Sequence, residues 1–494
     1  MIVRAPSVIK PEAPDRTYST RLRTALVFTG SGTAAAYHAG VLRALHESGL
    51  KVDLVAGRGA GVVGAFFAAV DGGAKLWETD GIWRSPAAAR FYGWRPPLRI
   101  AGWALVAAAL IFAVPLIVLA LAVLVGTVGL LLTLVGLDGP GALLRTSFTA
   151  WVDALFAPAA LPTIIPRLVL FAVLVAVGAL AAGVLWASIR ARARRRTHHG
   201  AMWRLIGSPL TAAAVVDRSL VELWNLIRGA APVAAPAPPE LARRYVELLA
   251  DNLGQPGFRE LLVAVHDLDA RRDLVFAMLG SAHRQRFFGR PGGPEHAARA
   301  LEVFDLAGVG RDHALDALAA ALALPAATEP HLATFSAEGL WRGETHRMCD
   351  RPGALARLLQ EVALAGAEQI ILVSASPPAG HAHELSAGRG DLRGRAGEQL
   401  GAFEAAGLRD VLEQFDGKFA GLYVIRPSHN PLGPLDFAGV YDERSDRTLP
   451  LAELTDRGYS DAYRQFIEPV VGAGGERIEA TGPAGASPGR TVQL

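Results

Sequence analysis

The sequence predicts an α/β domain with a parallel sheet that is interrupted by a membrane-spanning helical hairpin. Two observations lead to this prediction. Strand-like and helix-like segments alternate within residues 24–73 and again after residue 350, which is typical of a parallel sheet covered by helices. Between these parts, residues 100–137 and 168–189 contain no charged side chain. Runs of this length are typical of helices that cross a lipid bilayer.

The first part of the domain is expected to contain two strand–turn–helix units. The strands are apolar and rich in β-branched or aromatic residues, and each is followed by a glycine-rich turn. Each helix ends at glycine, which is typical of a helix C-terminus. The units comprise a strand over 24–28, a loop at 30–32, a helix over 34–48, a strand over 52–56, a turn at 57–61 and a helix that ends near Gly72 and Gly73.

The second part continues the alternation beyond the insert. An amphipathic helix and a linker rich in Ala and Pro come first, followed by shorter strand and helix candidates. The expected elements are a helix over 215–229, a linker over 230–239, strands over 261–265 and 274–278, helices over 314–324 and 353–365, a strand over 369–374, a helix over 397–414 and a strand over 420–425.

Together these segments give five expected regions. They are a flexible N-terminal segment (1–22), the first part of the α/β domain (23–98), the membrane insert (99–190, with spans at about 100–137 and 168–189), the remainder of the domain (191–470) and a disordered tail rich in Gly, Ala and Pro (471–494).

Basic residues orient the insert. They flank it on its outer sides, whereas the connection between the two apolar runs carries few charges. The positive-inside rule places both flanks in the cytoplasm, so we expect two spans in the inner membrane, in contact with membrane lipids, and a cytoplasmic α/β domain. The flanking residues are Arg90, Arg95, Arg99, Arg190, Arg192, Arg194, Arg195 and Arg196.

The number of crossings follows from a second argument. If one sheet is assembled from both sides of the insert, both parts lie in one compartment, and the number of crossings is even. The first run would be about 57 Å long as a straight helix, against a hydrocarbon core of roughly 30 Å. It must therefore tilt, kink at Pro115 or fold back.

Composition excludes several classes of protein. The 494 residues are 51% hydrophobic and 19% charged, against roughly 25% charged residues in soluble domains. A net charge of +3 is too small for a protein that binds nucleic acid by bulk charge. The single Cys349 excludes an intrachain disulfide and a cysteine-based zinc site, and His346 and Asp350 lack a third metal ligand. We predict no metal and no cofactor.

The two glycine-rich turns resemble those of the patatin-like phospholipase family. The segment ALVFTGSGTAAAYHAGVLRALHESGL starts at residue 25, and VDLVAGRGAGVVGAFFAAV starts at residue 52. The family has a strand, a Gly-rich loop and a helix, followed by a G-x-S-x-G turn between the next strand and helix. Residues 318–325 and 353–374 are similar to its later signatures. The resemblance covers about 23–75 and 205–430.

The resemblance implies a serine acyl hydrolase site. Such a site needs a nucleophile on a sharp strand–helix turn and backbone N–H donors for the oxyanion. The nucleophile position here is Gly59, which has no side chain to attack an ester. The other matching positions are Gly30, Ser31, Gly32 and Thr33 for the oxyanion loop and Gly57, Arg58 and Gly61 for the elbow.

The family's acid is expected in an Asp-Gly pair shortly after Pro325. Two positions match this place: Arg342, which precedes Gly343, and Glu338, which precedes Gly339. We therefore expect a membrane-anchored pseudoenzyme of lipid metabolism that has lost the Ser/Asp dyad and binds lipid or a protein partner. An active lipid acyl hydrolase with a displaced nucleophile is the alternative.

Four further residues are candidates for a role. Ser31 is expected to form a local hydrogen bond within its loop, and His38 to pack inside the first helix. Ser374 and Ser376 follow a buried strand, at the edge of the sheet where doubly wound domains bind ligands. No base is assigned to either serine.

A nucleotide-binding protein is the alternative from another class. Gly30-x-Gly32-x-x-Ala35, between a strand and a helix, fits the loose dinucleotide fingerprint. That reading needs an acid at the end of the second strand to hold the ribose, but Asp53 lies at its start. It also leaves the second glycine turn unexplained.

Overall fold

The computed structural model describes residues 18–155, 164–192, 207–289, 299–378, 392–427, 440–442, 447–449 and 451–472. They belong to two compact units, residues 1–93 with 210–494 and residues 94–209. The predicted insert, 99–190, falls within the second unit. Most of the predicted N-terminal segment (1–17), the tail (473–494) and Arg194 to Arg196 lie outside the described residues.

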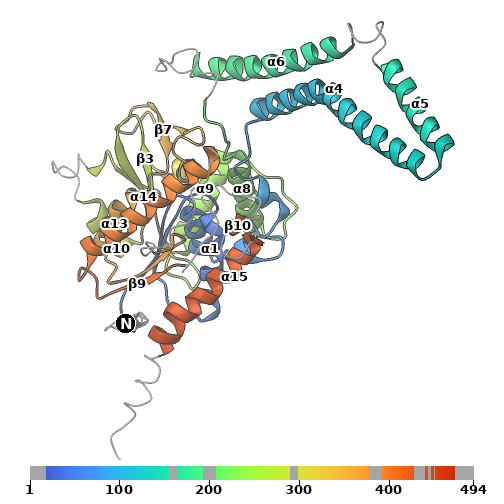
Figure 1. Ribbon diagram of the computed structural model, residues 1–494. Coiled ribbons are helices and arrows are strands. Elements are labelled where there is room, and N and C mark those ends of the chain that lie inside the picture. The colour runs from blue at the N-terminus through green and yellow to red at the C-terminus, as the bar shows by residue number, and fades with distance from the viewer. Residues whose placement is uncertain are drawn as a thin grey trace, which may run out of the picture. The chain divides into compact units, whose positions relative to one another are not determined.

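The predicted α/β class with a mostly parallel sheet is confirmed (Figure 1). Within the described residues, the strands of the large sheet follow the order β5-β4-β3-β2-β1-β8-β9, and β7 pairs with both β3 and β6. The strands are β1 (Thr24–Thr29), β2 (Leu54–Arg58), β3 (Glu260–Asp267), β4 (Arg272–Met278), β5 (Val303–Asp305), β6 (His331–Thr334), β7 (Thr345–Cys349), β8 (Gln369–Ser374) and β9 (Gly421–Ile425), with a separate pair β10 (Val440–Asp442) and β11 (Arg447–Leu449).

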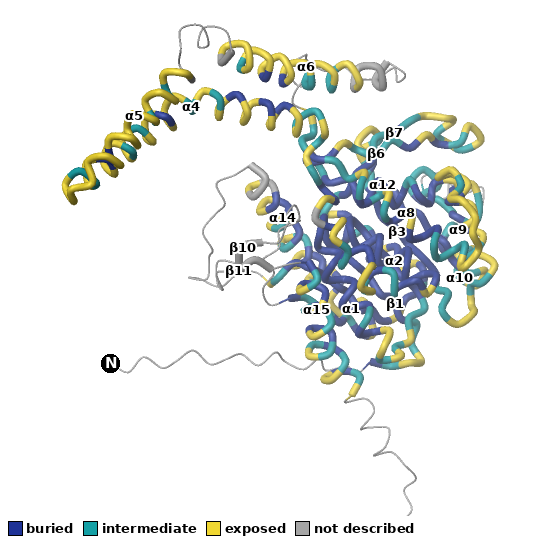
Figure 2. Tube along the Cα trace, turned by 90° about the vertical axis from the view of Figure 1, so that its right-hand side faces the viewer, coloured by how far each residue is buried: buried dark blue, intermediate teal, exposed yellow. Residues whose placement is uncertain are grey.

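Helices cover both faces of the sheet. As a result, alternate side chains of the central strands are buried on opposite faces, in two separate apolar clusters. Leu26 and Phe28 of β1 join one apolar cluster, and Ala25 and Val27 join the other. The dark core of Figure 2 corresponds to these two layers. On the first face lie α1 (Ala35–Glu47), α2 (Gly61–Ala69), α8 (Ala213–Arg228), α9 (Pro238–Asn252), α12 (Ala314–Leu322) and α15 (Leu451–Ala462), and on the second α10 (Ser281–Phe288), α13 (Ala354–Leu364) and α14 (Leu392–Phe415).

One edge of the sheet differs from the simple parallel pattern. The predicted strands at 261–265 and 274–278 are present, but they pair antiparallel as β3 and β4. Strands β6 and β7, which the sequence analysis does not predict, form an antiparallel hairpin, and β7 pairs with the end of β3. This hairpin brings the residue after β7, Asp350, to the central strands.

The second unit contains two helices that are long and apolar enough to cross a membrane. They are α4 (Pro96–Leu134) and α6 (Ile164–Arg192), joined by α5 (Asp138–Leu155), which the sequence analysis does not predict. Helices α4 and α6 pack through Ala101, Ala104 and Ala176. A Cβ atom at Gly183 would lie 3.1 Å from Pro97, so the two helices run antiparallel. Small residues permit such a close approach.

Candidate functional site

The elbow is a tight turn between β2 and α2. Gly59 follows the last residue of β2 and has φ +54°, a left-handed conformation in which glycine is favoured. The amide of Ala60, the next residue, donates a 2.8 Å hydrogen bond to the carbonyl oxygen of Gly30. In α/β-hydrolases, the amide of the residue after the nucleophile is an oxyanion donor. Here that amide is already bonded within the protein.

The space above Gly59 is occupied. A Cβ atom built on Gly59 would lie 2.4 Å from the Gly30 carbonyl oxygen and 2.7 Å from Oδ2 of Asp350. Both distances are shorter than a non-bonded contact allows. The loop of residues 30–33 and the Asp350 carboxylate therefore close over the turn at the place where a nucleophilic side chain would stand.

The carboxylate at the elbow belongs to Asp350, which from the sequence is a candidate only as a metal ligand. It follows β7, and its own amide bonds to the carbonyl oxygen of Ala323. The next residue, Arg351, donates from Nε to Asp273 of β4 over 2.9 Å, which holds the turn against the sheet. Asp350 is therefore the carboxylate that the structure places beside the elbow.

The two predicted acid positions lie elsewhere. Glu338 and Arg342 belong to the connection between β6 and β7, and both are exposed. Neither is among the atoms nearest to Gly59. The resemblance implies a carboxylate shortly after Pro325. In the structure the β6–β7 hairpin lies between Pro325 and Asp350, so the carboxylate comes later in the sequence.

Ser31 does not form the local bond that the sequence analysis expects from a loop serine. Its hydroxyl donates to Oδ2 of Asp350 over 2.6 Å, across 319 residues of sequence. Both side chains are buried, with exposed fractions of 0% for Ser31 and 1% for Asp350. The structure thus brings a serine and a carboxylate together at the loop of residues 30–33, which is adjacent to the elbow.

Arg58 supplies the positive charge of this site. Its Nη2 donates to Glu404 of α14 over 2.6 Å, lies 3.4 Å from the Ser31 hydroxyl and is 3.7 Å from the Asp350 carboxylate. The Glu404 carboxylate also accepts a 3.1 Å bond from the hydroxyl of Ser376. Because an unpaired buried charge is costly, this network holds the ends of β1, β2 and β8 to α14.

Burial raises the pKa of the Asp350 carboxyl above its usual range. The Arg58 charge and the Ser31 bond oppose this effect, and the Glu404 charge adds to it. The folded protein therefore holds the proton of Asp350 more tightly than the unfolded chain does. Unfolding releases that proton at a pH between the two pKa values, so this group makes the protein less stable as the pH rises through that interval.

We predict that Asp350→Asn removes this pH dependence. Asparagine keeps an acceptor for Ser31 but carries no buried negative charge. Tryptophan fluorescence in detergent measures the melting temperature of both proteins. The melting temperature of the variant minus that of the unaltered protein should increase steadily from pH 4.5 to pH 7.5. If this difference instead decreases as the pH rises, the fold favours the charged form of the Asp350 carboxylate.

The remaining polar candidates are His38, Ser374 and Ser376, and all three are buried. His38 is buried beside the loop, its Nε2 lies 3.0 Å from the carbonyl oxygen of Thr29, and burial lowers its pKa to about 3. It is therefore neutral at physiological pH. The Ser374 hydroxyl accepts a bond from the amide of Ser376. Of the two serines, only Ser376 takes part in the charged network described above.

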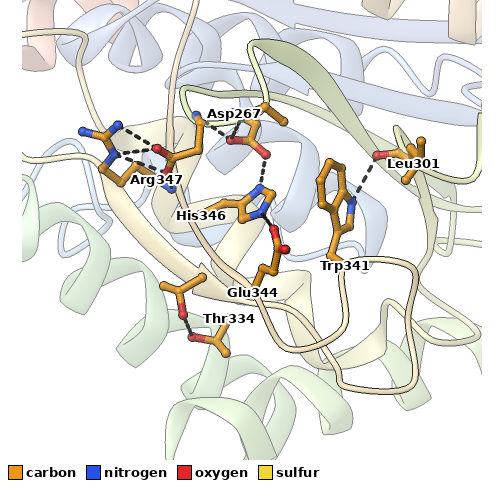
Figure 3. A network of polar contacts seen from close by, with 10 residues as sticks. Asp267, Leu301, Thr334, Trp341, Glu344, His346 and Arg347 are labelled. Carbon is orange, nitrogen blue, oxygen red and sulfur yellow. Dashed lines mark hydrogen bonds and ion pairs between the residues drawn. The ribbon is translucent and has the colours of Figure 1, made fainter. Parts of the chain in front are cut away.

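His346 lies in a polar network with Asp267 and Glu344 (Figure 3). Its Nδ1 is 2.5 Å from Asp267 and its Nε2 is 3.2 Å from Glu344, so both nitrogens are engaged by carboxylates. Trp341 packs edge-on against the imidazole ring. Among the described residues, no group of three His, Cys, Asp or Glu side chains is placed to hold a metal ion.

The geometry also bears on the nucleotide-binding alternative. Asp53 accepts a hydrogen bond from the amide of Thr24, at the start of β1. The loop at Gly30 follows the end of β1. Asp53 therefore lies at the amino ends of the parallel strands, whereas the glycine-rich loop lies at their carboxyl ends. From that position Asp53 cannot hold the ribose of a nucleotide bound at the loop.

No protein-family model matches the chain. No curated protein matches it either. Among solved structures, VipD from Legionella pneumophila is similar with 11% sequence identity and a TM-score of 0.29, over 96% of this chain and 72% of that chain. A likeness at this TM-score decides nothing about function, so the case for a function depends on the site itself.

Proposed function

We propose that the protein is a membrane-anchored, patatin-like protein of lipid metabolism that binds lipid, or regulates a partner, without hydrolysing esters. The observation that carries the proposal is the closed turn at Gly59. The position lacks a side chain, and the Gly30 carbonyl and Asp350 fill the space that a serine would need. The acid position is retained at Asp350, so the loss concerns the nucleophile alone rather than both members of the dyad.

The proposed anchor is the hairpin of α4 and α6 in the inner membrane, with the α/β domain in the cytoplasm. The arginines that flank the insert support this orientation. The domain itself accommodates an insert at this point, because the amide of Thr211 bonds to the carbonyl oxygen of Gly93 over 3.1 Å. The residues on either side of the insert are thus adjacent. The large sheet combines β1 and β2, which precede the insert, with strands that follow it.

We expect removal of the insert to release the domain from the membrane. In this variant a short Gly/Ser linker joins Gly93 to Leu210, whose backbone positions are adjacent. The full chain should sediment with membranes, resist a carbonate wash and need detergent for extraction, whereas the variant should stay in the supernatant and keep a cooperative thermal transition. A full chain that is soluble without detergent would contradict the proposed anchor.

The proposed loss of hydrolysis is tested with the full chain in detergent or in vesicles. Release of fatty acid from phosphatidylcholine, phosphatidylglycerol and a p-nitrophenyl ester should not exceed the rate of a preparation denatured by heat. The same protein should bind phospholipid vesicles in a flotation assay. Hydrolysis that disappears in Ser31→Ala or Asp350→Asn would overturn the proposal.

A second function is favoured by one observation. Ser31 donates to Asp350 over 2.6 Å, the arrangement of a nucleophile and its base, with the Arg58 guanidinium nearby. On this alternative the protein is an acyl hydrolase whose nucleophile has moved from the elbow to the oxyanion loop. It requires Ser31 to become accessible, since its side chain is fully buried. Activity abolished by Ser31→Ala but not by Ser376→Ala would establish it.

A further inference from the structure

One carboxylate in the site has an unusual place in its helix. The inner face of α14 is apolar and buried, apart from Glu404, which lies in the same stripe at helical spacing. A buried carboxylate is costly unless a specific partner requires it. The buried members of the stripe are Leu400, Glu404, Leu408, Val411 and Phe415.

The partners of Glu404 lie where open α/β sheets bind ligands. Arg58 ends β2, and Ser376 follows β8, on opposite sides of the central strand β1. Strand β2 lies on one side of β1 and β8 on the other. The connection from β1 to β2 and the connection from β8 to β9 therefore run in opposite directions along the sheet. A crevice outside the carboxyl ends of strands at such a switch point is the usual ligand site of this architecture.

Arg58 has more donors than its neighbours use. Its side chain is fully buried, and within the described part of the chain Nε and Nη1 have no hydrogen-bond partner. Arginine binds a carboxylate best through two parallel N–H donors. Glu404, which reaches the guanidinium from α14, engages only Nη2. An anion free to orient itself could use the unpaired donors as well.

We propose that Arg58 and Ser376 form a binding subsite for the carboxylate of a fatty acid, and that Glu404 occupies this subsite while no ligand is bound. The inference rests on the proposed lipid-binding function and names its ligand. A singly charged carboxylate suits the site better than phosphate, because Asp350 lies 3.7 Å from Nη2 and repels additional negative charge. Leu408, Val411 and Phe415 of the stripe are packed against the second face of the sheet. The acyl chain therefore reaches them only when displacement of Glu404 lets α14 move away from that face.

The test uses the full chain in a non-ionic detergent and octanoate as the probe. Removing the internal competitor by Glu404→Ala should tighten octanoate binding at least tenfold, measured by calorimetry. Glu413→Ala, an exposed glutamate on the same helix, is the matched control and should leave the affinity unchanged. Glu404→Gln, which keeps an acceptor for Ser376, should act in the same direction if the alanine variant fails to fold.

Three comparisons decide the outcome. Octanol, which has the chain without the charge, and inorganic phosphate, which has charge without the chain, should both bind Glu404→Ala at least tenfold more weakly than octanoate. In the unaltered protein, octanoate should increase hydrogen exchange in α14. Equal octanoate affinity with and without Glu404, stronger binding of phosphate, or no change in α14 would each overturn the subsite.

This result is separable from that of the proposed function. Octanoate contains no ester, so its binding does not depend on hydrolysis. Ester hydrolysis by the protein would overturn the non-hydrolytic function whatever octanoate does. The absence of both hydrolysis and octanoate binding would overturn the subsite alone.

Discussion

Gly59→Ser, which recreates the G-x-S-x-G pattern, is expected to yield an inactive and destabilised protein. The new Cβ would stand 2.4 Å from the Gly30 carbonyl oxygen and 2.7 Å from Asp350, in a left-handed conformation that side chains adopt at a cost. Strain and overpacking of this kind cost on the order of 2–4 kcal/mol of unfolding free energy. Thermal unfolding and an ester hydrolysis assay measure the two consequences.

Two control variants separate sterics from chemistry. Gly59→Ala introduces the same Cβ without a hydroxyl and should lose about as much stability as Gly59→Ser. Gly64→Ala lies one turn into α2, where a Cβ would meet Phe28 at an ordinary 3.5 Å, and should be neutral or stabilising. Substantial ester hydrolysis by Gly59→Ser alone would show that the elbow is open in solution and that only the hydroxyl is missing.

Arg58→Met is expected to produce the largest loss of stability among single changes at the site. It leaves the buried carboxylates of Asp350 and Glu404 without their cation. Removing one partner from a buried ion pair costs about 3–5 kcal/mol, because the remaining charge is uncompensated. The loss should be smaller at pH 5 than at pH 8, because removal of the Arg58 charge raises the pKa of Asp350 further and protonation then relieves this carboxylate. Thermal unfolding across this range measures both effects.

The companion variants locate the cause of that loss. Adding Glu404→Gln to Arg58→Met should recover part of the stability, because one of the two stranded charges is removed. Arg243→Met breaks an exposed pair with Asp312 and should change stability little, since such pairs are solvated and screened. An Arg58→Met protein as stable as the Arg243→Met protein would mean that the buried network does not hold α14 in place.

The parts of this fold that the sequence predicts are those encoded locally. The two strand–turn–helix units could be located because apolar runs and glycines follow one another within a few residues. The elements β1, α1, β2 and α2 are all present, with β2 two residues later than predicted and α2 ending at Ala69 rather than near Gly72. The two long apolar helices α4 and α6 are equally local, since length and absence of charge suffice to locate them.

The site itself depends on contacts that no local pattern reveals. Ser31 and Asp350 are separated by 319 residues, and Arg58 and Glu404 by 346. The place of Asp350 beside the elbow could not be predicted, because Arg351 stands where the resemblance implies a glycine and because the β6–β7 hairpin lengthens the spacing from Pro325. One signal was present: Asp350 lies three residues before the predicted helix over 353–365, in the turn that follows β7.

The most direct test of the closed elbow is the mass of the intact protein after exposure to a fluorophosphonate, which labels activated serines. The full chain in detergent should keep its unmodified mass under conditions that label a serine hydrolase completely, because Gly59 offers no hydroxyl and Ser31 is buried. A stoichiometric adduct that peptide mapping assigns to Ser31 would contradict this account and identify the protein as a hydrolase with a relocated nucleophile.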